Sequence, residues 1–334
     1  MVSPPLRYLS AADVLAALPG IGERLELARR TLVALVADAD LPPKIGVHPR
    51  PTDSFAHAMP AALRGPARDG REDLLGMKWV TGFPTNASLG VAAIHALVLL
   101  SDARTGVPRA ILDGGALTAH RTAAVSGAAL ARWAPPVEGR PTEVALVGAG
   151  VQARSHLPVL AHLLPGSRVT ICDLDAGRAE SLADDVAAGR SGLGAFREVG
   201  ATTDPAEAVE GADVVVTLVS FGPQRQAIAA EAFGPSSTIV AVDYDMCVPA
   251  SVAERADLFL TDERDQFLAT RSASVFAAYP DPHVTLGEAI SADTPRPPGR
   301  VLVTHLGVGL ADVVFGDAIL REAESRDIGT ILPR

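Results

Sequence analysis

The chain has 334 residues, of which 48% are hydrophobic and 20% charged, and its formal net charge is −10. This length predicts two domains, because single cores of this size are uncommon. The acidic balance argues against binding to nucleic acid or to an anionic membrane surface, since both require clustered lysine and arginine.

The cysteines and the apolar runs are typical of a soluble protein. Cys172 and Cys247 lie beside apolar strand-like runs and are expected to be small core residues, since they form neither a disulfide framework nor a metal-ligand spacing. The N-terminus has no basic-then-apolar signal pattern, and the apolar run at residues 91–100 is far shorter than the ~20 residues of a membrane span. We therefore expect a cytoplasmic protein with no membrane contact and no metal.

The N-terminal third predicts a mostly antiparallel sheet flanked by helices. Ser10 followed by Asp13 predicts a helix start, and a second helix is predicted over residues 23–38. Strands are predicted at residues 54–59, 74–80, 94–100 and 110–112. A helix is predicted over residues 117–133, and the domain boundary is placed in or near it.

From residue 144 onward, strand and helix patterns alternate, which is typical of a parallel sheet with helices on both faces. Strands are expected at residues 144–147, 168–172, 213–219, 239–242, 258–261 and 301–304, and helices at 153–164, 177–188 and 205–209. A final helix is predicted over about residues 311–324.

The segment Val144–Ala153 has the features of a dinucleotide-binding turn. Gly148 would make the sharp turn, Gly150 would let the backbone approach a pyrophosphate, and Ala153 would allow close packing of the helix. Val151 and Gln152 lie in the same turn and are expected to contact the cofactor. The alternative is a turn that serves only packing.

The residues after the next strand indicate which dinucleotide is bound. Asp173 lies 25 residues after Gly148, where an acidic residue binds the adenosine ribose hydroxyls. Asp175 follows, so a 2′-phosphate would meet two carboxylates, and NAD is favoured; Arg178 leaves NADP possible. A nicotinamide cofactor implies hydride transfer.

Polar residues in apolar surroundings are the candidates for the chemistry beside the cofactor. Lys78 either faces a site or lies on an edge strand with its ammonium in water. Arg121 lies in an alanine-rich helix, and its alternative is a surface role. Asp243 and Asp245 end a predicted strand, where ligands bind in open parallel sheets, or they cap the next helix.

Together, these residues make the chain resemble the ornithine cyclodeaminase/mu-crystallin family over most of its length. The motifs follow the family's order: Pro42-Pro43-Lys44, Met59-Pro60, Met77-Lys78-Trp79-Val80, Phe83-Pro84-x-Asn86, Asp102-x-x-Thr105-Gly106-x-Pro108, Leu117-Thr118-Ala119-x-Arg121-Thr122-Ala123-Ala124, Gly148-Ala149-Gly150-Val151-Gln152-Ala153 and Gly307-x-Gly309-x-x-Asp312-Val313.

The resemblance implies a homodimer with an α/β fold. Residues 1–120 plus 306–334 would form an α+β domain that binds substrate and dimerises, and residues 121–305 a Rossmann NAD(P)-binding domain. By position, Lys78 and Arg121 would bind the substrate carboxylate, and Lys44 stands where many members carry an arginine for the same purpose. Arg121 and Thr122 would also contact the cofactor.

The catalytic residues implied by the resemblance are Lys78 and Asp245. Asp245 corresponds to the family's acid/base, and Asp243, two residues earlier on the same predicted strand face, is the alternative. Two departures concern the substrate: His57 stands where cyclodeaminases carry a glutamate, and Met246-Cys247-Val248-Pro249 replaces their Pro-Gly-Lys loop. His57 would donate a proton, recognise the substrate side chain by contact, or simply be an ordinary hydrogen-bonded histidine.

We therefore expect an NAD(P)-dependent oxidoreductase acting on the C–N bond of an amino acid or its imine or ketimine. One alternative is an amino-acid cyclodeaminase that recycles NAD. Another is an NAD(P)-dependent small-molecule binding protein without turnover, as in the crystallin branch of the family.

Overall fold

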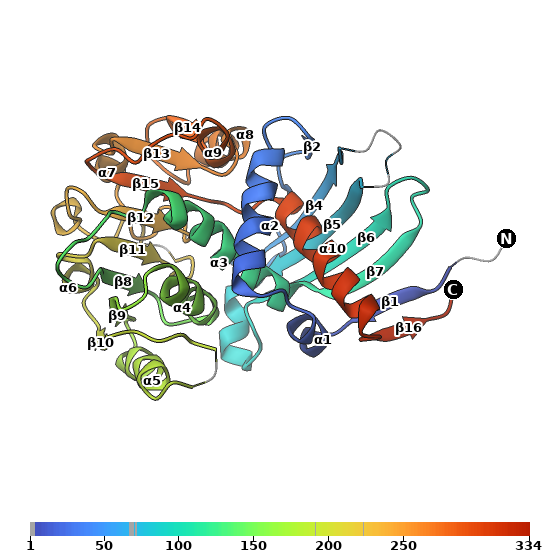
Figure 1. The fold of residues 1–334 in the computed structure, drawn as a ribbon, viewed down its shortest axis with the longest axis horizontal. Coiled ribbons are helices and arrows are strands. Elements are labelled where there is room, and N and C mark those ends of the chain that lie inside the picture. Colours follow the sequence, from blue (N-terminus) through green and yellow to red (C-terminus); the bar gives the residue numbers. More distant parts are fainter. Residues whose placement is uncertain (1–3, 67–69, 71, 191, 223) are drawn as a thin grey trace. The chain divides into compact units, whose positions relative to one another are not determined.

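The computed structural model describes residues 4–66, 70, 72–190, 192–222 and 224–334. The chain divides into two compact units: unit 1 comprises residues 1–121 and 307–334, and unit 2 comprises residues 122–306. Each unit contains one eight-stranded sheet (Figure 1). Helix α3 (Gly114–Trp133) begins in unit 1 and ends in unit 2.

The sheet of unit 1 is mostly antiparallel, as the alternating patterns predict. Its strands run in the order β16-β1-β7-β6-β5-β4-β2, and β3 also pairs with β4. Among the described strands of this sheet, only β1 and β7 pair in parallel. The strands are β1 (Leu6–Leu9), β2 (Ala39–Asp40), β3 (Ile45–Val47), β4 (Phe55–Leu63), β5 (Leu74–Gly82), β6 (Ile94–Asp102), β7 (Pro108–Asp113) and β16 (Thr330–Leu332), and η1 (Pro84–Leu89) is a 3₁₀ turn.

One face of this sheet is covered by α10 (Gly309–Ser325), which packs on β4, β5 and β6 and against α2 (Ile21–Ala34). The fit is close, because a Cβ on Gly309 would lie 2.5 Å from the Met59 carbonyl oxygen. Helix α1 (Ala11–Ala16) begins with the predicted capping box, in which the Ser10 hydroxyl accepts from the Asp13 N–H.

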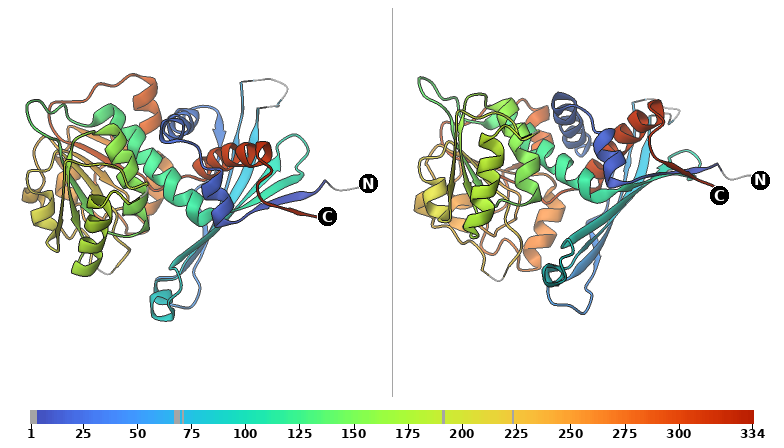
Figure 2. Two further views of the ribbon diagram at one scale, coloured as in Figure 1. Left: turned by 60° about the horizontal axis from the view of Figure 1, so that its bottom comes forward. Right: turned by 90° about the horizontal axis from the view of Figure 1, so that it is seen from below.

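The opposite face of the unit 1 sheet, here called the outer face, carries exposed apolar side chains. The register aligns Ile45, Ala58, Trp79 and Leu97 in one row across β3, β4, β5 and β6. Ile45, Trp79 and Leu97 are 58%, 43% and 46% exposed. Both views in Figure 2 show α10 lying on the other side of the sheet. Exposed apolar rows of this kind mark interaction surfaces.

The sheet of unit 2 is entirely parallel, in the order β10-β9-β8-β11-β12-β15-β13-β14. Its strands are β8 (Glu143–Val147), β9 (Arg168–Cys172), β10 (Glu198–Thr202), β11 (Val214–Thr217), β12 (Thr238–Ala241), β13 (Leu258–Thr261), β14 (Val284–Thr285) and β15 (Val301–Thr304). From β8 the chain builds outward through β9 and β10, then returns to add β11 on the other side. Ligands of doubly wound sheets bind where the strand order reverses in this way.

The connections of unit 2 are α4 (Val151–Leu163), α5 (Ala176–Ala187), α6 (Pro205–Val209), η2 (Ala230–Ala232), α7 (Ala250–Glu254), α8 (Arg264–Ser272) and α9 (Leu286–Ser291). A core of aliphatic residues with Phe259, Phe267 and Phe276 packs within this unit. The α/β fold class predicted from the sequence is confirmed. None of the helices in the described ranges has the length and apolar character that a membrane crossing needs.

The prediction that Asp243 and Asp245 lie on the same face of a strand is wrong. Strand β12 ends at Ala241, and both acids lie in the turn that follows. Tyr244 between them has φ +63°, in the left-handed region, so the alternation of a strand does not continue through it.

Candidate functional site

Lys78 and Arg121 share one buried carboxylate in unit 1. The Lys78 Nζ lies 2.7 Å from Oδ2 of Asp312, and the Arg121 Nε donates to Oδ1 of Asp312 at 3.2 Å. The three residues come from β5, α3 and α10 and are at most 5% exposed. Because a buried charge is costly without a partner, the ion pairs explain how these side chains remain in the interior.

The local sequence explains this arrangement. Lys78 pairs with Met59 and Val98 across the sheet, and both of these side chains are buried. Asp312 lies in the first turn of α10, where the helix dipole favours an acid. Gly307 has φ +78°, and a Cβ there would lie 2.6 Å from an Arg121 guanidinium nitrogen, so glycine leaves the room that the guanidinium needs.

The electrostatics suit an anionic ligand. Burial, reinforced by the charge of Arg121, lowers the pKa of Lys78 to about 7, although Asp312 acts in the opposite direction. Two bases therefore share a single acid, and an incoming carboxylate would favour the charged lysine. Asp312 was not among the site residues predicted from the sequence. The signal for it was Lys78 and Arg121 themselves, since buried bases require an acid.

His57 and Lys44 belong to the same region of unit 1. His57 lies on β4 and shares a sheet face with Met59 and so with Lys78; its ring stacks on Phe55 with centroids 4.5 Å apart. Burial and the charges of Lys44, His48 and Lys78 lower the pKa of His57 to about 4. The imidazole is therefore neutral near pH 7. In this form one ring nitrogen donates and the other accepts a hydrogen bond, and the ring does not act as an acid. Lys44 precedes β3, and its charge also lowers the pKa of Lys78.

The turn between β8 and α4 has the geometry of a dinucleotide cradle. Gly148 has φ +109°, and a Cβ there would lie 2.8 Å from the Leu218 carbonyl oxygen. Gly150 is the N-cap of α4 and provides no side-chain cap, so the first N–H groups of the helix have no such acceptor. A Cβ on Gly150 would have no described atom within 4 Å, and Ala153 is fully buried. The residues present therefore fit a bound pyrophosphate.

The remaining residues predicted for the cofactor lie on or near this turn. Asp173 follows β9, and its carboxylate accepts from the N–H groups of Ala149 and Asp175 at 2.9 and 3.0 Å. Val151 is 71% exposed at the start of α4, and the Oε1 atom of Gln152 is buried without a hydrogen-bond partner among the described residues. Thr122 is buried on α3.

Asp243 and Asp245 are buried in different surroundings within unit 2. Asp243 accepts from the Thr217 hydroxyl at 2.7 Å and from the Val219 N–H at 3.3 Å, and burial raises its pKa to about 6. Asp245 is fully buried; one of its oxygens lies 2.5 Å from the Arg225 guanidinium and the other accepts from the Phe276 N–H at 2.9 Å.

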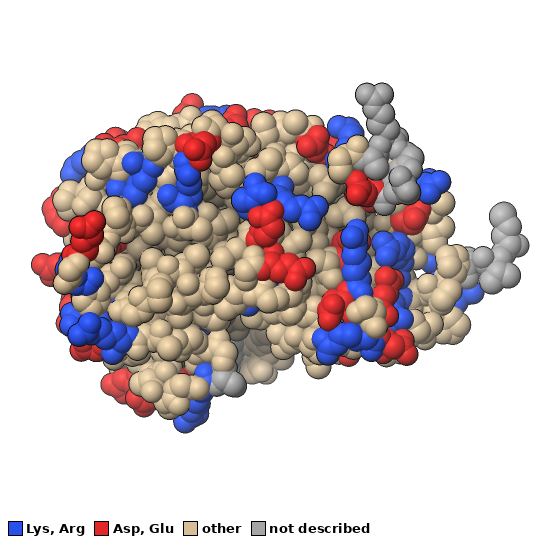
Figure 3. All heavy atoms as spheres, in the orientation of Figure 1, with Lys and Arg blue, Asp and Glu red and all other residues tan. Residues whose placement is uncertain are grey.

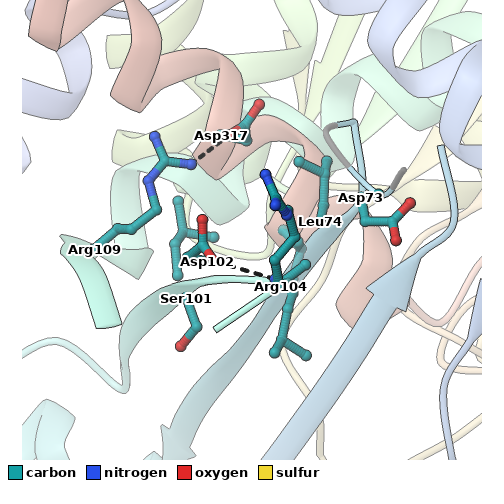
Figure 4. Close-up of a pocket in the computed structure, with 12 residues that line it drawn as sticks. Asp73, Leu74, Ser101, Asp102, Arg104, Arg109 and Asp317 are labelled. Atoms are coloured by element: carbon teal, nitrogen blue, oxygen red, sulfur yellow. Dashed lines mark hydrogen bonds and ion pairs between the residues drawn. The ribbon is translucent and has the colours of Figure 1, made fainter. Parts of the chain in front are cut away.

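Two cavities in unit 1 lie apart from these residues. The smaller, shown in Figure 4, has a volume of about 140 Å³ and is lined by charged side chains such as Arg109 and Asp317, which pair at 3.5 Å. It is smaller than the ~300 Å³ of typical ligand pockets, and we assign it no ligand. The larger, of about 720 Å³, runs between α2 and α10. Within the described ranges, no three His, Cys, Asp or Glu residues are arranged to hold a metal.

A Rossmann-like parallel sheet and a buried Lys–Asp–Arg cluster are thus present in one chain. The model of the ornithine cyclodeaminase/mu-crystallin family matches residues 23–295, and the chain belongs to this family. It is 30% identical to the nodulation efficiency protein NfeD of Rhizobium meliloti over 98% of each chain. It is also 30% identical to the ketimine reductase mu-crystallin of Mus musculus, over 75% of this chain and 76% of that protein.

Solved structures agree on the fold. The Delta(1)-pyrroline-2-carboxylate reductase of Thermococcus litoralis, in complex with NADH and L-proline, matches with a TM-score of 0.82 and 21% identity, covering 97% of this chain and 99% of that chain. The resemblance seen in the sequence motifs is thereby confirmed at the level of family and fold.

Proposed function

We propose that this protein is an NAD-dependent oxidoreductase that reduces the imine or ketimine of an amino acid, or oxidises the corresponding amine. The observation that carries the proposal is the Lys78–Asp312–Arg121 cluster, which suits a carboxylate, in a chain that also has a dinucleotide cradle. Relatives named as ketimine and pyrroline-2-carboxylate reductases support this reaction class.

The substrate carboxylate would be bound in unit 1. Arg121 offers a planar fork of N–H donors, and Lys78 offers a point charge that the carboxylate would stabilise in its protonated form. Lys44 adds positive charge nearby, and the neutral His57 would form hydrogen bonds with the substrate side chain. Fixing the carboxylate also fixes the adjacent carbon, which is the reacting atom in this class of substrate.

The cofactor would be bound in unit 2, at Gly148, Gly150, Val151, Gln152 and Ala153. Bound NAD(H) supplies or accepts the hydride at the carbon of the C–N bond. Asp173 would bind the adenosine ribose, and Arg121 and Thr122 would contact the cofactor from α3. A 2′-phosphate would meet the carboxylates of Asp173 and Asp175, which supports NAD over NADP, although the exposed Arg178 lies 3.8 Å from Asp175.

A proton must reach the nitrogen when the imine is reduced. Asp245 is the family's position for this role, but in this chain it is paired with a cation, Arg225, which favours its charged form, whereas Asp243 accepts only from neutral donors. Asp243 has a pKa near 6, which suits proton exchange at neutral pH. We therefore propose that Asp243 exchanges the proton and that Asp245 orders the surrounding loops. Asp243→Asn should then lower kcat and remove the limb of the pH profile near 6, whereas Asp245→Asn should mainly lower Tm.

The reaction class can be tested by measuring NADH consumption and ammonia release with the same substrates. 2-Oxo acids mixed with amines, cyclic imino acids and diamino acids would each be supplied with NADH or NAD. Net NADH oxidation with an imine and no net ammonia release supports the proposal. Ammonia release from a diamino acid without net cofactor turnover would instead identify a cyclodeaminase. NADH binding with no turnover of any of these substrates would identify a binding protein.

The assembly we propose is a homodimer. Unit 1, bounded near residues 120 and 306, would bind the substrate and dimerise, and unit 2 would bind NAD(H). The exposed row of Ile45, Trp79 and Leu97 on the outer face supports pairing through the unit 1 sheet, since apolar rows of this size are usually covered in solution.

A further inference from the structure

Ser126, His156 and His305 form a buried chain of hydrogen bonds in unit 2 that the proposed mechanism does not use. The Ser126 hydroxyl oxygen lies 2.8 Å from Nε2 of His156 and 2.9 Å from Nε2 of His305. All three residues are at most 2% exposed. They come from three elements, since Ser126 lies on α3, His156 on α4, and His305 directly after β15.

The direction of each hydrogen bond follows from the carbonyl group at one end. Nδ1 of His156 lies 2.7 Å from the Gln152 carbonyl oxygen, which can only accept, so Nδ1 carries a hydrogen. Burial lowers the pKa of His156 to about 4, so the ring is neutral and its Nε2 has a lone pair. Ser126 therefore donates to His156, and its oxygen accepts from the Nε2–H of His305.

This row of hydrogen bonds ends at the dinucleotide cradle. Gln152 is the second residue of α4, and its carbonyl oxygen receives the hydrogen bond from His156. Ser126 lies four residues after Thr122 on α3, so the two share one face of that helix. The hydroxyl of Ser126 thus links the first turn of α4 to α3 and to the end of β15. A pyrophosphate bound by helix N–H groups is sensitive to the direction in which those groups point.

We propose that Ser126 is a positioning residue for the dinucleotide, and that its hydroxyl, by bridging His156 and His305, holds the first turn of α4 in the orientation that binds the pyrophosphate. The inference rests on the proposed function, because it takes NAD(H) as the ligand of residues 148–153. It gives a role to a buried polar group of unit 2 that the proposed mechanism does not use.

The test is a titration of the purified full-length protein with NADH, followed by NADH fluorescence in the absence of substrate. Ser126→Ala should raise the Kd of NADH about tenfold, because two buried hydrogen bonds lose their shared partner. Ser126→Thr, which retains the hydroxyl, should restore binding. With NADH at saturation, the substrate KM of Ser126→Ala should equal that of the wild type, since Lys78, Arg121 and Asp312 are untouched.

The matched control is Ser237→Ala. Ser237 is 3% exposed and precedes β12, and its hydroxyl donates to the Gly234 carbonyl oxygen at 2.9 Å. Its removal should lower Tm but leave the Kd of NADH unchanged, which separates positioning from general destabilisation. If Ser126→Ala does not fold, His305→Ala is the second probe and should weaken NADH binding at least about threefold, with recovery in His305→Gln, which retains an N–H donor.

The outcomes separate this inference from the proposed function. Wild-type protein that binds no NADH would overturn the proposed function, and the positioning role with it. Wild-type protein that binds NADH, together with a folded Ser126→Ala variant of equal affinity, would overturn the positioning role alone. Equal weakening by Ser126→Ala and Ser237→Ala would do the same, because the effect would then be one of stability.

Discussion

Lys78 is a buried lysine whose charge changes within the neutral pH range. Its pKa is lowered to about 7, whereas an unfolded lysine titrates at about 10.4. The protonated form binds a carboxylate, so affinity is full below pH 7 and falls as the pH rises. The unfolded chain holds this proton more tightly than the folded protein does. As the pH rises from the folded to the unfolded pKa, the contribution of Lys78 to the free energy of unfolding therefore increases.

The first prediction concerns the Kd of a carboxylate inhibitor whose own charge does not change over this range. For the wild type, Kd should increase above about pH 7 by up to about tenfold per pH unit. In Lys78→Arg the profile should be flat, because a guanidinium stays charged, although binding at low pH should be weaker than in the wild type. A wild-type profile that is flat from pH 6 to 9 would contradict the lowered pKa.

The second prediction concerns Asp312, the acid shared by both bases. Asp312→Asn leaves Lys78 and Arg121 buried beside each other, so the free energy of unfolding should fall by about 3–5 kcal/mol. Asp317→Asn on the same helix is the control, since its partners Arg109 and Arg321 have side chains that are 36% and 66% exposed, and about 1 kcal/mol is expected. Equal losses in chemical denaturation would argue against the buried cluster.

The sequence predicts the two bases, Lys78 and Arg121, but not the acid that pairs with them, Asp312. Lys78 and Arg121 were predicted because a charge in an apolar run is unusual. Asp312 lies 191 residues from Arg121 in the chain, and no local pattern connects them. The placement of Asp243 and Asp245 failed for a local reason, namely the left-handed backbone of Tyr244, which a strand pattern does not reveal.

In the turn between β8 and α4, one glycine is needed for folding and another for binding. Gly148 is needed for the fold, because its φ is +109° and a Cβ would clash with the Leu218 carbonyl. Gly150 has ordinary backbone angles and open space around it. The two glycines therefore have different tasks, although they belong to one motif.

The third prediction follows from this difference. Gly150→Ala should fold with a Tm close to that of the wild type but bind NADH at least about tenfold more weakly, because the methyl group would occupy the path of the pyrophosphate. Gly148→Ala should lower Tm as well. Thermal melts and NADH titrations of the two variants check this, and unimpaired NADH binding by Gly150→Ala would place the cofactor elsewhere.

How well each element was predicted depended on its burial. Strands β9, β13 and β15 were located to the residue and β8 to within one residue, because each is a short apolar run, and the central strands of a parallel sheet are buried on both faces. Six strands were missed, since they are short and mostly only partly buried or exposed: β1, β2, β3, β10, β14 and β16. Helix α2 ends at Ala34 rather than at residue 38, because the last residues form turns.

The surface of the molecule has regions of mixed charge and a region of exposed apolar side chains. Acidic and basic side chains are mixed over the face seen in Figure 3, and ion pairs such as Arg321–Asp317 and Arg29–Glu26 join them on α10 and α2. The outer face of the unit 1 sheet is apolar by comparison. This contrast favours association through the sheet rather than through the helices.

The fourth prediction tests that association. Trp79→Lys and Leu97→Lys place charges in the exposed row and should convert a dimer to monomers at micromolar concentration, as measured by light scattering after size-exclusion chromatography. Leu15→Lys, at a residue of α1 that is 52% exposed, should leave the mass unchanged. A monomeric wild type would contradict the proposal.

The order of the units along the chain has a consequence for synthesis. Unit 2 is a continuous segment, whereas unit 1 combines residues that precede unit 2 with residues that follow it. During translation, β4 to β6 emerge before unit 2, but α10, which covers them and carries the acid for Lys78 and Arg121, emerges after it. Unit 2 can therefore fold on the ribosome while the first sheet still lacks its cover. A nascent chain arrested before residue 309 would expose both faces of that sheet and should be a client for chaperones.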